Sequence, residues 1–265
     1  MPELPEVETI RRQLAPVITG ATVTSGWAHP SAKFAEAPAA VGHTIRAVGR
    51  RGKYLIVSLD RDVELIVHLG MTGALSVVDS PGDEYVRAWW RLDDDGRLEF
   101  RDVRRFGRIA VTPAGEYDRL PTLAALGPEP LGDEFTADHL WRSLRTSRRA
   151  VKTQLLGQRV VAGVGNIYAD EALWRARIHP QATRLSPERA TRLRGALCDV
   201  LAAGIRHGGT TLRDYVDAEG SAGSHQRHLD CYGRAEMPCH RCETGLRRVT
   251  LDGRSATYCP ACQRI

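Results

Sequence analysis

Two Cys-x-x-Cys pairs near the end of the chain constrain its folding more than any other feature. Cys239 and Cys242 form the first pair, Cys259 and Cys262 form the second, and sixteen residues separate them. This spacing is typical of a structural zinc ribbon, in which each pair bends two thiolates toward one metal ion. A β-hairpin with its turn at 251–254 would bring the pairs together. Because four cysteines fill a tetrahedral site, we expect one structural Zn²⁺ and no catalytic metal.

Two alternatives to this site stay open: a redox-active cysteine pair, and ligation by His240 in place of one cysteine. The remaining cysteines, Cys198 and Cys231, are expected in the hydrophobic core. The acidic start MPELPEVE is unlike a secretory leader. The sequence contains no run of about 18 apolar residues, so it predicts no membrane span. We therefore expect a cytosolic protein without membrane contact, in which stable disulfides are rare.

The charge of the chain indicates a polyanionic partner. The formal net charge is +5 and the isoelectric point is about 9.0, which also fits an ordinary basic enzyme. The distribution is more informative, because basic side chains gather in three stretches, 97–108, 142–152 and 227–264. Separate basic patches favour contacts with nucleic-acid phosphates.

Hydrophobic periodicity divides the chain into four parts, which we expect at 1–112, 113–132, 133–228 and 229–265. The first begins with a helix from Pro5 to about Leu14 and continues in strands, which predicts a two-layer β-sandwich. Prolines and glycines crowd the second part, a linker. The third part shows helical periodicity over five segments: 137–144, 151–156, 167–175, 187–207 and 211–216. The fourth is the cysteine-rich segment.

The first residues carry candidate chemistry. Removal of the initiator methionine would leave Pro2 with a free secondary amine. An α-amine has a pKa of roughly 8, against about 10.4 for lysine, so more of it is unprotonated and nucleophilic near neutrality. Glu3 and Glu6 could transfer protons beside it. The alternative is a disordered start in which the glutamates only oppose the helix dipole.

Several motifs follow one another over nearly the whole chain: PELPEVETIRR at 2–12, GKYL at 52–55, HLGMTG at 68–73, DVRRFG at 102–107, VAGVGNIYADEALW at 161–174, GGTTLRD at 208–214 and YGR at 232–234. With the cysteine pairs, they resemble the formamidopyrimidine-DNA glycosylase/endonuclease VIII family, on the formamidopyrimidine side. The resemblance implies an α+β fold: an N-terminal β-sandwich with flanking helices, a helix–two-turns–helix domain and a C-terminal β-hairpin zinc finger.

The resemblance also implies an activity: a base-excision-repair DNA glycosylase and AP lyase that removes 8-oxoguanine and formamidopyrimidines. Pro2 matches the family's nucleophile, which forms a Schiff base and promotes β- and δ-elimination. Glu3 matches the general acid/base, and Glu6 a supporting carboxylate near the lesion. Lys53 matches the lysine on the phosphate beside the lesion; from the residues alone it is a solvated turn lysine.

Matches to the family's DNA contacts lie in both halves of the chain. Met71, Arg104 and Phe106 match the residues that fill the space left by the extruded base. The remaining matches are Lys152, a basic residue of the helical domain, Asn166, and Arg254 of the zinc finger. The alternatives are that Met71 and Phe106 are core residues and that Asn166 is a helix N-cap.

The chain departs from the family at the lesion-capping loop, expected at 216–228. Its length favours purine lesions, but Ser221, Ala222 and Ser224 stand where many relatives carry a long residue and an aromatic. A glycosylase for oxidised pyrimidines or a broad range of lesions is therefore an alternative. A non-catalytic binder of damaged DNA is another, although Pro2 and Glu3 are present. We expect a monomer on damaged double-stranded DNA, in the bacterial cytoplasm at the nucleoid.

Overall fold

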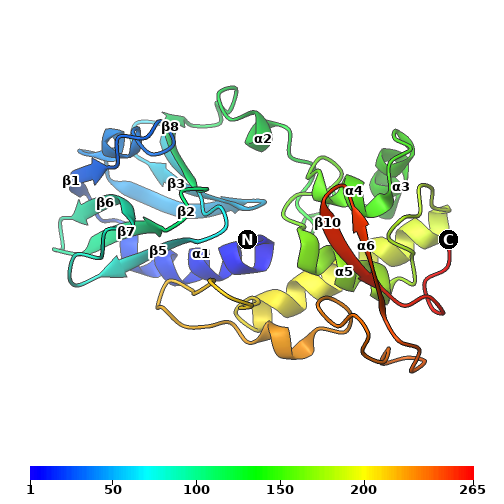
Figure 1. Ribbon diagram of the computed structural model, residues 1–265. Coiled ribbons are helices and arrows are strands. Elements are labelled where there is room, and N and C mark those ends of the chain that lie inside the picture. The colour runs from blue at the N-terminus through cyan, green and yellow to red at the C-terminus, as the bar shows by residue number, and fades with distance from the viewer. The chain divides into compact units, whose positions relative to one another are not determined.

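The computed structural model describes residues 1–265, which form two compact units (Figure 1). The first unit comprises 1–124 and 205–226, and the second comprises 125–204 and 227–265. Most of the expected capping loop therefore packs with the first unit, and the domain borders expected from the sequence remain predictions. No helix has the length and apolarity needed to cross a lipid bilayer.

The first unit is a β-sandwich with α1 (Leu4–Ile18) against it, as the sequence predicts. Two four-stranded antiparallel sheets have the orders β1-β6-β7-β5 and β2-β3-β4-β8. The strand bounds are β1 (Val23–Ala28), β2 (Ile45–Arg51), β3 (Tyr54–Leu59), β4 (Val63–His68), β5 (Gly73–Val78), β6 (Val86–Leu92), β7 (Arg97–Asp102) and β8 (Arg108–Pro113). A turn at 93–96 joins β6 to β7.

One apolar core lies between the two sheets and α1. Val7, Ile10 and Leu14 recur at helical spacing and are at most 2% exposed, so one face of α1 is buried. Trp90 of β6 packs into the same core. Its indole N–H donates to the Ala37 carbonyl of η1 (Ala37–Ala40) at 2.8 Å. This core fixes the strand ends and loops that carry the candidate site.

The remaining elements are mostly helical. Their bounds are α2 (Pro121–Ala124), α3 (Ala137–Arg145), α4 (Val151–Leu156), α5 (Asn166–Arg175), α6 (Pro187–Arg206), η2 (His225–His228), β9 (Arg247–Leu251) and β10 (Arg254–Tyr258). The strands β9 and β10 form the expected hairpin. The helix expected at 211–216 is wrong. There the Thr211 hydroxyl donates to the Tyr215 carbonyl at 2.9 Å, a side-chain bond that competes with helical hydrogen bonding.

Candidate active site and nucleic-acid interface

The start of the chain is buried and ordered. Pro2 is buried, and Glu3 is 2% exposed at the N-cap of α1. The Glu6 carboxylate accepts the backbone N–H of Glu3 at 2.7 Å on one oxygen and that of Thr210 at 2.7 Å on the other. Glu6 is 1% exposed and thus fixes two backbone segments. The alternative of a disordered start is wrong.

The helix that carries Glu3 and Glu6 also holds the capping loop. Gln13 donates to the Asp217 carboxylate at 2.9 Å and accepts the Ala218 N–H at 3.0 Å. The other Asp217 oxygen accepts the Ser221 N–H at 2.8 Å, which closes a turn within the loop. These bonds give the first half of the loop a defined shape.

Lys53 stands in a tight turn between β2 and β3, where Gly52 adopts φ +55°. Its side chain is buried, with 6% exposed, so the alternative of a solvated turn lysine is wrong. Burial lowers the pKa of the adjacent His68 to about 4, and the positive charges of Lys53 and Arg108 act in the same direction. His68 is therefore neutral near pH 7, and its Nδ1 accepts the Gly70 N–H at 3.2 Å.

Glu8 of α1 forms an ion pair with Arg50, on the strand that leads into this turn. Its carboxylate accepts hydrogen bonds from Arg11 and Arg12 on its own helix, at 2.8–3.0 Å. Arg50 of β2 donates to it at 3.1 Å and also donates to the Gly52 carbonyl at 3.0 Å. Burial raises the pKa of Glu8, but the hydrogen bonds and charges of these arginines outweigh it and lower the pKa to about 2.

This pKa predicts a loss of stability in acid. The folded pKa lies below the usual value of 4.5, so the ionised Glu8 stabilises the fold fully above pH 4.5. The contribution falls as the pH drops from 4.5 toward 2. We expect Glu8→Gln to lower the free energy of unfolding at pH 7 and to lower it much less at pH 3. Urea denaturation of the variant and of the unmodified protein measures the difference at each pH. A destabilisation of equal size at the two pH values would contradict the assignment.

Two neighbouring loops of the first unit expose apolar side chains. Met71, between β4 and β5, is 38% exposed, and Phe106, between β7 and β8, is 48% exposed. The core alternative for both is therefore wrong. The Arg104 guanidinium lies 4.7 Å from the centroid of the Phe106 ring, and the Lys33 ammonium lies 5.8 Å from it. Exposed apolar groups among cations are suited to insertion between nucleic-acid bases.

Asn166 is the first residue of α5, and its N-cap is Gly165. The alternative that Asn166 itself caps the helix is wrong. Its Oδ1 atom is buried without a hydrogen-bond partner, and Gly163 adopts φ +80° in the preceding turn. The first-turn N–H groups of a helix attract anions, which agrees with a phosphate contact here.

The structure corrects the expectation that Lys152 contacts DNA. Its side chain is fully buried and lies 2.6 Å from the Asp170 carboxylate. Its ammonium also donates to the Ser255 carbonyl at 2.5 Å, and the second Asp170 oxygen accepts the Thr257 N–H at 2.9 Å. Burial raises the pKa of Asp170 to about 6, against the lowering effect of Lys152. The pair fastens β10 to the helices, because a buried charge requires a partner.

Arg254, the first residue of β10, is exposed. It follows a turn in which Asp252 and Gly253 have positive φ angles of 46° and 75°. The Asp252 carboxylate accepts a hydrogen bond from the Thr153 hydroxyl at 2.7 Å, which ties the hairpin turn to α4. Arg254 is thus a free cation on an anchored turn, as expected for a phosphate contact.

The four expected cysteines are brought together. The sulfur atoms of Cys239, Cys242, Cys259 and Cys262 all lie within 4.8 Å of one another, and no histidine belongs to the group. The alternative in which His240 is a ligand is therefore wrong, since its Nδ1 lies 2.8 Å from Asp230 instead. Four thiolates in a tetrahedral cluster suit Zn²⁺.

A buried tryptophan completes the surroundings of this cluster. Trp174, at the end of α5, packs with Cys239 and Cys259 in a small core, and its indole nitrogen is buried. Burial raises the pKa of the Cys239 thiol, but several hydrogen bonds, one of them from this indole N–H, outweigh burial and lower it. An indole donor beside a thiolate is expected where the sulfur binds a metal ion. The cluster holds one structural Zn²⁺.

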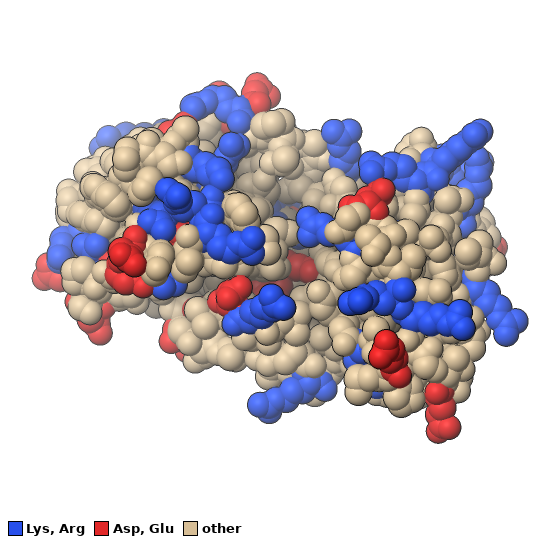
Figure 2. Space-filling view, viewed as in Figure 1, with Lys and Arg blue, Asp and Glu red and all other residues tan.

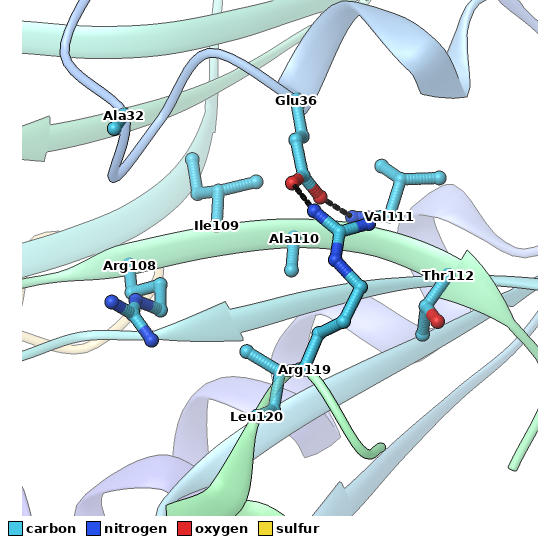
Figure 3. Close-up of a pocket in the computed structure, with 9 residues that line it drawn as sticks. All are labelled: Ala32, Glu36, Arg108, Ile109, Ala110, Val111, Thr112, Arg119 and Leu120. Carbon is cyan, nitrogen blue, oxygen red and sulfur yellow. Dashed lines mark hydrogen bonds and ion pairs between the residues drawn. The ribbon is translucent and has the colours of Figure 1, made fainter. Parts of the chain in front are cut away.

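A separate cavity of about 170 Å³ lies on β8 (Figure 3). Its main charged groups satisfy one another, because the Glu36 carboxylate accepts hydrogen bonds from Arg119 and from the Val111 N–H. Arg108, Thr112 and five apolar residues make up the rest of the lining, and the Thr112 hydroxyl donates to the Glu116 carbonyl at 2.8 Å. The candidate chemistry therefore lies with the N-terminal turn and the exposed loops. Figure 2 shows exposed Lys and Arg side chains on each of the two units.

A β-sandwich that buries Pro2, a helical unit with an anchored four-cysteine finger and exposed basic side chains together define a nucleic-acid-binding protein. Three family models match the chain in order: the formamidopyrimidine-DNA glycosylase N-terminal domain at 1–109, the H2TH domain of the same proteins at 126–216, and the zinc finger found in FPG and IleRS at 238–265. The chain belongs to the formamidopyrimidine-DNA glycosylase family.

Individual relatives agree along their full length. The formamidopyrimidine-DNA glycosylase of Herpetosiphon aurantiacus is 45% identical over 99% of this chain and 100% of its own. The crystal structure of MutM (FPG) from Thermus thermophilus is similar, with a TM-score of 0.92, 43% identity and coverage of 99% and 98%. A Lactococcus lactis FPG variant in complex with Fapy-dG-containing DNA has a TM-score of 0.90 and 35% identity, with both chains fully covered. The fold expected from the sequence is confirmed.

Some functional groups could not be seen in the sequence. Asp102, Thr72 and Gln13 belong to the family motifs or to α1, but their partners lie in other segments of the chain. Asp170 and Trp174 stand in the motif at 161–174, and only the fold shows what they contact. The acidic pair Asp170 and Glu171, which stands between apolar residues of α5, was the available signal for Asp170.

Proposed function

We propose that this protein is a bifunctional base-excision-repair enzyme, which removes oxidised purines from double-stranded DNA and then cleaves the strand as an AP lyase. The observation that carries the proposal is the buried N-terminal turn, in which one oxygen of Glu6 fixes the backbone of Glu3 and the other fixes the backbone of Thr210. A nucleophile needs such a fixed position, because orientation removes much of the entropic cost of the reaction. The family membership of the chain supports the same activity.

In the proposed mechanism, loss of Met1 gives Pro2 a secondary amine. Its lone pair attacks C1′ of the damaged nucleotide, and the bond from C1′ to the base breaks, with the electron pair and a proton going to the base. The first product is an aminal, in which C1′ is bonded to the Pro2 nitrogen and still to the ring oxygen O4′. Glu3 supplies a proton to O4′ as the C1′–O4′ bond breaks, which opens the sugar ring and gives an iminium that links Pro2 to the sugar; Glu3 takes protons afterwards. Loss of the 2′ proton expels the 3′ phosphate, a second elimination expels the 5′ phosphate, and water releases Pro2.

DNA binding in this proposal uses charge and insertion. Lys53, Asn166 and Arg254 contact phosphates, while Met71, Arg104 and Phe106 fill the space left by the extruded base. Lys152 acts indirectly, by fastening the strand that carries Arg254. The relatives are bacterial proteins, and we propose that this one acts as a monomer in the bacterial cytoplasm, at the nucleoid.

The lesion preference follows from the capping loop. Its first half is shaped by Gln13 and Asp217, whose side chains accept the N–H groups of Ala218 and Ser221. Ser221, Ala222 and Ser224 are small, so these positions offer no long side chain for recognition. The length of the loop favours purine lesions such as 8-oxoguanine and formamidopyrimidines, and a Lactococcus lactis FPG variant forms a complex with Fapy-dG-containing DNA.

Borohydride trapping tests this function. Reduction of the iminium should join the protein covalently to a duplex with 8-oxoguanine opposite cytosine, giving a band shift on a denaturing gel. An adduct only with an oxidised-pyrimidine duplex would move the enzyme to the pyrimidine branch. No adduct with either lesion or with an abasic site, despite tight binding, would leave a non-catalytic binder of damaged DNA.

A further inference from the structure

A buried carboxylate that the mechanism does not use joins the two loops that expose Met71 and Phe106. Asp102, the last residue of β7, is fully buried. One of its oxygens accepts the Thr72 hydroxyl at 2.6 Å, from the loop before β5. The other accepts the Gly107 N–H at 2.7 Å, at the far end of the loop after β7. One side chain therefore fixes both loops.

Thr72 extends this connection to the residue expected to meet the orphaned base. Its oxygen accepts the backbone N–H of Arg104 at 3.1 Å. A hydroxyl has a single proton, which here goes to the Asp102 carboxylate, so its lone pairs are free to receive the Arg104 N–H. A hydroxyl polarised by a carboxylate is a stronger acceptor than an isolated one. The chain of hydrogen bonds from Arg104 to Thr72 and from Thr72 to Asp102 thus depends on both the Thr72 hydroxyl and the Asp102 carboxylate.

The two loops also touch without side chains between them. Gly70 adopts φ +68°, and a Cβ atom there would lie 2.5 Å from the backbone of Phe106 and Gly107. A Cβ atom on Gly107 would lie 2.9 Å from the His68 carbonyl and 2.5 Å from the Phe100 ring. Backbone packing this close leaves no room for one loop to move past the other. The hydrogen bonds of Asp102 and this packing make the loops a single body.

We propose that Asp102, acting through Thr72, is a positioning residue that sets the spacing of Met71, Arg104 and Phe106 before DNA is bound. The proposal rests on the proposed function, in which these three residues replace an extruded base. Unstacking a base costs free energy, and two loops that are already ordered avoid the further cost of ordering them on the DNA. Asp102 and Thr72 therefore affect the rate of base extrusion and not the reaction at Pro2.

Thr72→Val is the informative substitution, because valine keeps the shape of threonine and removes only the hydroxyl. We use a duplex with 8-oxoguanine beside 2-aminopurine, whose fluorescence rises when the neighbouring base leaves the stack. In stopped-flow mixing, the rise should slow about tenfold in Thr72→Val, and single-turnover excision should slow with it. Thr72→Ser, which restores the hydroxyl, should recover most of the rate. Asp102→Asn should act in the same direction as Thr72→Val.

An abasic-site duplex separates positioning from general damage. It has no lesion base to extrude, so its cleavage by Thr72→Val should stay within about twofold of the unmodified protein. Equal losses on both duplexes, or an unchanged fluorescence rise in a folded Thr72→Val protein, would overturn the inference. If the unmodified protein cuts neither duplex, the proposed function itself fails, which is a different result. Thr72→Val keeps the test available should Asp102→Asn not fold.

Discussion

Replacement of Pro2 by glycine is expected to reduce excision of 8-oxoguanine by about 100-fold or more while leaving duplex binding within about twofold. Glycine keeps an α-amine, but it loses the pyrrolidine ring that fixes φ and aims the nitrogen. The structure makes this loss large, because Glu6 and α1 hold the following residue rigidly and the ring transmits that rigidity to the amine. Single-turnover excision and fluorescence anisotropy on an abasic-analogue duplex measure the two effects separately.

Glu3→Gln is the matched control, since it keeps the amine and replaces the carboxyl group by an amide, which cannot transfer a proton. A preformed abasic site already offers an open aldehyde, so Glu3→Gln should still form the borohydride adduct there while failing to excise an intact base. Pro2→Gly should lose most of both. If Pro2→Gly excised 8-oxoguanine at the original rate, another amine would be the nucleophile, and the buried N-terminal turn would need a different explanation.

The features that could be predicted from the sequence are those that depend on the spacing of residues close together in the chain. The cysteine pairs carry their own spacing, and the strands around 54–69 show apolar runs broken by a polar turn. The exposure of Met71 and Phe106 was the less obvious outcome, because apolar residues are usually buried and only the family resemblance indicated otherwise.

The failures have a common physical cause, which is that pairing across the chain overrides local appearance. Lys152 follows a run of arginines and looks like a surface cation, yet Asp170 and the Ser255 carbonyl draw it into the interior. The segment at 211–216 has acceptable helical periodicity, but Thr211 bonds to Tyr215 and also accepts the Gly223 N–H at 2.9 Å. Neither set of partners can be inferred from the neighbouring sequence.

Removal of zinc is expected to weaken duplex binding by about tenfold or more, because the finger positions Arg254 and phosphate contacts carry much of the affinity. Structural zinc supplies about 10 kcal/mol or more to the folding of such small modules. Cys259→Ser should therefore unfold the hairpin while the β-sandwich, with its own core, stays folded. Metal analysis should give one zinc per chain before the change, and anisotropy measures the loss of binding.

The sharpest control is Cys198→Ser, because Cys198 lies outside the cluster and donates only to the Pro130 carbonyl. This variant should retain one zinc and bind the duplex normally, which separates loss of the metal from loss of any thiol. Trp174 offers a direct signal, since its indole lies against the Cys239 sulfur and its fluorescence should change when zinc leaves. If Cys259→Ser lost its zinc and changed the Trp174 signal yet still bound the duplex as tightly, the finger would be a folding element alone, and the affinity would have to come from the β-sandwich and the N-terminus of α5.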